Sequence, residues 1–189
     1  MSQPLCNSDC TGTLPAFDFS KCNPDIENGQ ISKVFFTTSG NPLTNWGSAV
    51  EWASRLDNDA AGASSIRTLI GIGDLPAAES TEKEVSLGRK IYGVKKFTLN
   101  FKVDEVNTNI NEAMRLIDCS TGSFLGWFET RDHKLFGGNA GLPISIKSDI
   151  VVPEGYQDIM YYQLTITWED QYKPEMIDSP ITDTTGDQF

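Results

Sequence analysis

Runs of alternating apolar and polar residues dominate the chain between residues 31 and 168. In the clearest run, residues 95–104, four apolar side chains share one face by a period of two: Phe97, Leu99, Phe101 and Val103. Because successive side chains of a strand point to opposite faces, this alternation predicts a strand that is buried on one side. Other runs rich in β-branched and aromatic residues predict further strands. They cover residues 31–37, 66–72, 124–130, 134–138, 144–152 and 161–168, and residues 88–93 are expected to pair as an edge.

Two segments have the spacing of amphipathic helices. Thr44 is expected to cap the first helix, and Asn107 or Thr108 is expected to cap a second one that runs to Asp118. Residues 77–90 between the predicted strands are polar and are expected to form a charged loop. The predicted apolar stripes are Trp46, Ala49, Val50, Ala53 and Leu56 in the first helix, and Ile110, Ala113, Met114 and Ile117 in the second.

The predicted strands outnumber the helices and do not alternate with them regularly, which argues against a doubly wound α/β sheet. We therefore expect a mainly β fold, an antiparallel β-sandwich or small barrel with one or two flanking helices, over residues 31–168. Residues 1–30, rich in Pro, Gly, Asn, Asp and Ser, predict an extended N-terminal arm. Residues 169–189 carry six carboxylates against one lysine, and this acidic C-terminal tail is expected to be solvated or bound to another chain.

The net charge, the length of the apolar runs and the histidine count argue against several classes of function. The 189 residues carry a formal net charge of −11, which disfavours general binding to a phosphate backbone. No apolar run is long enough to cross a bilayer, so no membrane partner is expected. The chain has a single histidine, which limits His-dependent catalysis.

The motifs that would bind a cofactor or metal are incomplete. Gly71-Ile72-Gly73 lacks the third glycine and the following helix of a dinucleotide fingerprint. The carboxylate-rich segment that opens at Asp57 has Thr68 where a calcium loop needs a bidentate carboxylate. We expect no cofactor and no metal. Cys6, Cys10 and Cys22 lack a second zinc-type pair, so they are expected to be thiols or to include one disulfide, and Cys119 is expected to be buried.

The sequence also lacks a nucleophile motif. His133 falls in a predicted hairpin turn, and no G-x-S-x-G segment accompanies it. We therefore expect no catalytic residue and no enzyme activity. Core packing is the preferred interpretation of Trp46, Trp127 and Trp168. Trp52 lies two positions past Val50, so we expect it to face partly away from the core as an interface anchor.

The element order over residues 85–170 resembles that of structural proteins of tailed bacteriophages, of the tail-tube or neck-ring type. The matching features are the long amphipathic strand 95–104, the helix 107–118, the strand with the aromatic pair Trp127-Phe128, and the hairpin that returns through residues 134–138. The resemblance implies an architectural virion protein, synthesised in the host cytoplasm. It would form a ring or stacked rings with copies of itself and other virion proteins. Double-stranded DNA would pass through the lumen without specific binding, because an acidic lumen repels phosphates.

Besides Trp52, the expected contact residues lie in three regions. Phe17 and Phe19 alternate in the arm, which would dock on its own domain or on a neighbour. The loop 74–89 would contact the next ring or subunit, and Asp132 and His133 would form a rim contact. The expected contact residues of this loop are Glu79, Glu82 and Glu84. The alternatives are a monomeric β-sandwich module that binds carbohydrate or a host surface, a capsid-associated auxiliary protein, and a hydrolase with a carboxylate pair.

Overall fold

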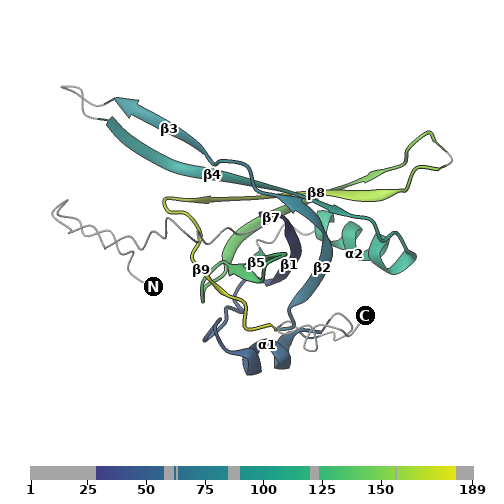
Figure 1. The fold of residues 1–189 in the computed structure, drawn as a ribbon, viewed down its shortest axis with the longest axis horizontal. Coiled ribbons are helices and arrows are strands. Elements are labelled where there is room, and N and C mark those ends of the chain that lie inside the picture. Colours follow the sequence, from purple (N-terminus) through teal and green to yellow (C-terminus); the bar gives the residue numbers. More distant parts are fainter. Residues whose placement is uncertain are drawn as a thin grey trace, which may run out of the picture.

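The computed structural model describes residues 29–57, 62, 64–84, 90–119, 124–155 and 157–181. Six antiparallel strands close into a barrel, because the first and last strands of the series also pair with each other (Figure 1). In order around the barrel these strands are β1 (Ile31–Thr38), β2 (Arg67–Asp74), β4 (Lys90–Val103), β8 (Tyr161–Asp170), β7 (Leu142–Val151) and β5 (Phe124–Thr130).

Three shorter strands and two helices add to this barrel. β3 (Glu79–Glu84) pairs with β4, β6 (Lys134–Phe136) pairs with β5, and β9 (Met176–Asp178) pairs with β6. The helices are α1 (Ala49–Arg55) and α2 (Thr108–Cys119). The predicted mainly β fold with flanking helices is confirmed, and of the two predicted architectures the structure is the small barrel.

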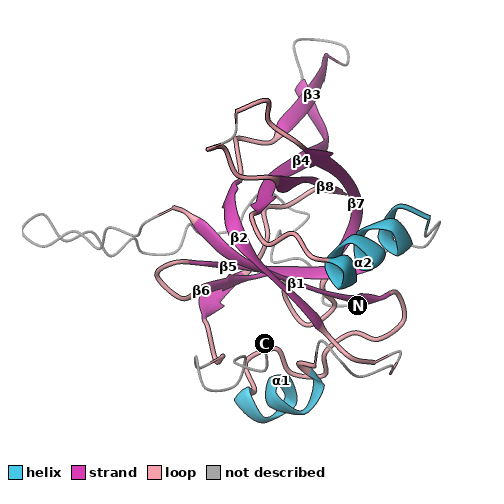
Figure 2. Cartoon of the chain, turned by 90° about the vertical axis from the view of Figure 1, so that its right-hand side faces the viewer, coloured by secondary structure: helices cyan, strands magenta, loops and turns pink. Residues whose placement is uncertain are grey.

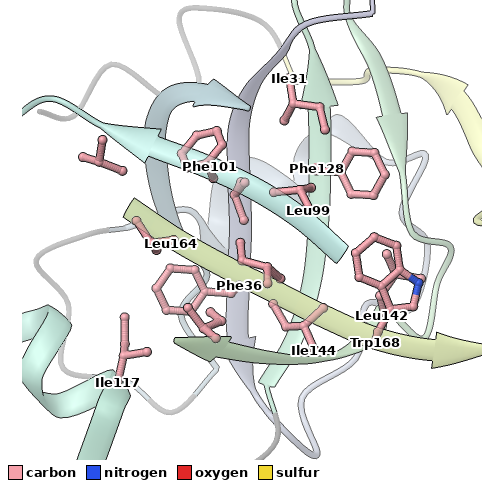
Figure 3. Packing of buried hydrophobic residues seen from close by; sticks show 14 of the residues in the cluster. Ile31, Phe36, Leu99, Phe101, Ile117, Phe128, Leu142, Ile144, Leu164 and Trp168 are labelled. Atoms are coloured by element: carbon pink, nitrogen blue, oxygen red, sulfur yellow. The ribbon is translucent and has the colours of Figure 1, made fainter. Parts of the chain in front are cut away.

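The main core fills the inside of the barrel (Figure 3). As the period-two pattern predicted, β4 points its four alternating apolar side chains inward, and each is buried. β7 and β8 supply further inward residues, and Met114 and Ile117 of α2 complete the same cluster. The predicted stripe of α2 is confirmed at these two positions and at Ile110, which packs half-buried against the same cluster, whereas Ala113 is exposed. Cys119 is also exposed, so the expectation that it is buried is wrong.

A second core lies between α1 and the outer side of β1 and β5 (Figure 2). Both strands are therefore buried on two faces: Phe36 points into the barrel, while Phe35 belongs to the outer cluster. The residues of this outer cluster are Phe35, Leu43, Trp46, Trp52, Ile66, Trp127, Leu135 and Ile181.

The orientation predicted for α1 is wrong. Ser48, not Thr44, caps the helix by accepting a hydrogen bond from the Glu51 amide. Val50 is 79% exposed, whereas Trp52 is fully buried. Trp52 is the buried residue of this seven-residue helix. The tryptophan occupies the inner face because burying its ring removes far more apolar surface from water than burying valine would.

The carboxylate of Glu51 fixes the loop before α1. Its two oxygens accept the amide hydrogens of Thr44, at 2.7 Å, and Asn45, at 2.8 Å. Burial opposes ionisation of Glu51, but these amide hydrogen bonds, helped by Arg55, outweigh it and hold the pKa of this carboxyl below its usual value.

We expect Glu51→Gln to lower the free energy of unfolding by about 1 kcal/mol at pH 7, because the charge-assisted hydrogen bonds become neutral. A carboxyl whose pKa is lowered by folding stabilises the protein above its unfolded pKa, and this stabilisation is lost as the pH falls through the folded pKa. Melting curves at pH 7 and at pH 3 should therefore show a larger deficit at pH 7 than at pH 3. An equal deficit at both values would contradict this role of the charge.

Part of the predicted acidic tail belongs to the folded domain, so the expectation that the tail is solvated or bound elsewhere is wrong for this part. β9 pairs with β6, with Ile177 opposite Leu135. Ile181 follows and is buried in the outer cluster. Ile177 and Ile181 attach this otherwise acidic segment to the domain. The first lies in the strand that pairs with the edge of β6, and the second packs on the apolar surface of the outer cluster.

The Gly71-Ile72-Gly73 segment has a packing role. β2 crosses β4 so closely here that a Cβ on Gly71 would lie 2.1 Å from the carbonyl oxygen of Lys102. A Cβ on Gly73 would lie 2.6 Å from the ring of Phe101. The two glycines therefore allow the close approach of β2 and β4 that the barrel requires.

Candidate assembly surface

Residues 79–84 and 90–96 form a strand pair that stands clear of the barrel (Figure 1). The register places Glu79 opposite Lys96 and Glu84 opposite Lys90. β8 meets β4 only from Lys95 onward, so no described strand lies on the other side of residues 90–94. The expectation of a loop over residues 77–90 is therefore wrong for β3. We call β3 together with residues 90–96 of β4 the projection.

Glu79, Glu82 and Glu84 all lie in β3, so the structure brings these three expected contact residues together. The residue opposite Glu82 is Tyr92, and lysines stand opposite the other two glutamates. Opposite charges that face each other across a strand pair stabilise the pairing. Glu79 and Lys96, which face each other in this way, therefore support the pairing of β3 with β4.

Asp132 and His133 lie in the turn between β5 and β6, as predicted. His133 has a φ of 57°, a left-handed conformation that is uncommon for residues other than glycine. Its carbonyl oxygen accepts a hydrogen bond of 2.7 Å from the Ser179 amide, so the C-terminal segment holds the turn. The imidazole of His133 is 58% exposed, while Asp132 is half-buried.

The imidazole of His133 contacts a buried carboxylate that sequence reasoning missed. Its Nδ1 atom lies 3.0 Å from Oε1 of Glu129, a residue that is 1% exposed. The other oxygen, Oε2, lies 4.0 Å from Nζ of Lys33 and accepts no hydrogen bond from the described residues. Lys33 and Glu129 are register partners where β1 and β5 close the barrel. A buried carboxylate needs a nearby cation to offset the loss of solvation. We therefore interpret Lys33 and Glu129 as an ion pair that links β1 to β5 where the barrel closes.

All four tryptophans are buried. The interpretation of Trp52 as an interface anchor is therefore wrong. Its ring contacts the rings of Phe35 and Trp127, with centroids 5.2 Å and 5.5 Å away, and its Nε1 donates to the carbonyl oxygen of Trp46. A carbohydrate module would need exposed aromatic faces, and these four side chains do not supply them.

The end of the molecule opposite the projection carries exposed apolar side chains (Figure 1). It consists of α2 and the far end of the β7–β8 hairpin. Sequence reasoning missed this surface, although apolar residues on both sides of the turn at 153–158 could have indicated it. The exposed apolar residues are Leu116, Ile150, Val152, Ile159 and Met160.

The described residues do not form a cluster of three or more His, Cys, Asp or Glu side chains that could hold a metal ion. A cavity of about 10 Å³ lies inside the barrel, lined by residues such as Leu99, Ile166 and Trp168. This volume is no more than one water molecule needs, so the cavity is not a ligand site. Phe17 and Phe19 of the arm, together with Cys6, Cys10 and Cys22, lie outside the described residues.

No known protein-family model and no curated protein sequence matches the chain. Neither α1 nor α2, the helices of the part of the chain that the structure describes, is long and apolar enough to cross a membrane.

Proposed function

We propose that this chain is a non-enzymatic structural protein of a tailed-bacteriophage virion that self-assembles into rings or a tube of the tail or neck. The observation that carries the proposal is the projection. A strand pair that extends beyond a closed barrel buries little of its own surface, so its two strands gain most by contact with another chain.

The unpaired edges of the projection suit this role. Among the described residues, β3 pairs with one strand only, and residues 90–94 of β4 have no partner on the side away from β3. Unpaired backbone amides and carbonyls at a strand edge are a template for pairing with a neighbouring chain. The projection continues from the barrel strand β4, which pairs with β8 from Lys95 onward.

The charge of the chain fits a channel for genome delivery. At a formal −11, its surface repels phosphates on average, so DNA would slide through the lumen without specific binding. In this proposal the N-terminal arm, with Phe17 and Phe19, contacts a neighbouring copy, and other virion proteins bind the faces of the ring. The protein would be made in the bacterial cytoplasm and reside in the virion.

The proposal predicts a closed oligomer in solution. Light scattering on the purified chain should give a mass that is a fixed multiple of 20.8 kDa over a range of concentrations. A carbohydrate array probed with the same sample should show no specific binding. A monomer at every concentration, or selective binding to one class of glycan, would contradict the proposal and favour the binding-module alternative.

A further inference from the structure

The projection has an unpaired strand edge along residues 90–94 of β4. β3 occupies one side of these residues, and β8 meets β4 only from Lys95 onward. The backbone groups on the other side therefore have no strand partner among the described residues. Val94, at the inner end of this edge, is 56% exposed, so an apolar side chain lies beside these backbone groups. Such an edge is suited to an extended segment that brings apolar side chains of its own.

The chain contains a segment of this kind in its N-terminal arm, outside the described residues. Residues 14–19 read Leu-Pro-Ala-Phe-Asp-Phe, and Phe17 and Phe19 would share one face of a strand. Pro15 has no amide hydrogen, and proline is confined to edge strands for this reason. A strand with this sequence therefore fits at the outside of a sheet, which is the position that an added strand takes.

The arm joins the barrel beside the strand that leads into the projection. β1 begins at Ile31, which pairs with Gly73 of β2. β2 ends one residue later at Asp74, and the projection begins with Glu79. Residues 20–30 connect the alternating segment to β1, and a chain of this length spans about 35–40 Å when extended. Because a small domain is about 30 Å across, the arm is long enough to reach the projection of a neighbouring copy.

We propose that residues 14–19 of one copy add as a strand to the edge formed by residues 90–94 of β4 in a neighbouring copy. The inference rests on the proposed self-assembly and names the two segments that make the contact. Because these segments are different parts of the chain, the contact is heterologous. Repetition of such a contact produces a ring if the rotation closes. An arm that folded back onto its own projection would fill the edge and leave no site for a neighbour.

Mixing two variants tests the contact. Phe17→Pro with Phe19→Pro removes two rings and two amide donors from the arm, and an Asn-Gly turn in place of residues 81–94 removes the edge. We expect each variant to require at least about tenfold more protein than the wild type for assembly. An equimolar mixture should form heterodimers that do not grow further, because one variant supplies the arm and the other supplies the edge. Gln3→Pro with Ser8→Pro is the control, since it places two prolines in the arm outside the alternating segment.

The outcomes separate this inference from the function on which it rests. Heterodimers in the mixture, identified by light scattering, together with normal assembly of the control would support the contact. Wild-type melting temperatures of both variants would show that they are folded. Normal assembly of the arm variant, or a mixture that stays monomeric while the wild-type chain forms rings, would overturn the contact and leave ring formation standing. A wild-type chain that is monomeric at every concentration would overturn both proposals.

Discussion

Removal of the outer part of the projection should abolish assembly while the barrel stays folded. The register allows a defined excision, because Ser80 faces Lys95 in the β3–β4 pair. An Asn-Gly turn in place of residues 81–94 would join these two partners as a tight hairpin. The barrel part of β4, which pairs with β8 from Lys95 to Val103, remains intact. We expect a monomer by light scattering, with the far-ultraviolet circular dichroism of a β protein.

The thermal stability of the shortened chain is the control for this excision. The barrel core lies wholly outside residues 81–94, so the melting temperature of the shortened chain should stay within a few degrees of that of the wild type. Ring formation by a shortened chain that folds normally would show that the projection is not the assembly element. The central observation behind the proposed function would then be lost.

Truncation of Trp52 should cause the largest loss of stability among single substitutions on α1. Trp52→Ala removes a fully buried indole that contacts Phe35 and Trp127, and the cavity left behind adds to the lost transfer energy. We expect the free energy of unfolding to fall by about 3–5 kcal/mol, measured by urea titration. This outcome would agree with the position of the ring in the outer core.

Val50→Ala is the matched control for Trp52→Ala. It truncates an apolar residue on the same helix, but one that points into solvent. Its effect on stability should stay within about 0.5 kcal/mol. If Trp52→Ala instead blocked assembly and left stability unchanged, the tryptophan would be an interface anchor after all, against the burial that the structure gives it.

The sequence predicted the barrel strands well, because β4, β7 and β8 alternate apolar and polar residues with one buried face, and β1 and β5 are rich in apolar and aromatic residues that are buried on two faces. The prediction from sequence failed where a segment is a strand only because it pairs with another strand. β3 is polar throughout and is a strand because β4 pairs with it. β9 is three residues long and depends on the free edge of β6. Acidic residues before Gly88 and basic residues after it were the available signal for the β3–β4 hairpin.

The candidate surface was only partly predictable for the same reason. The local cluster of Glu79, Glu82 and Glu84 identified the correct region. The contact between His133 and Glu129 could not be foreseen, because nothing in the local pattern of β5 distinguishes a buried carboxylate from an exposed one. Trp52 was misplaced because helical spacing gives a periodicity but not the face that a short helix buries, and that face is set by β1 and β5.

The most direct test of ring or tube formation is electron microscopy of the purified chain at the concentration where its mass by light scattering has reached a plateau. The proposed assembly predicts closed rings, or stacks of them, with an open centre and one fixed copy number. Particles no larger than a single 20.8 kDa domain at that concentration, or disordered aggregates without a repeat, would contradict it.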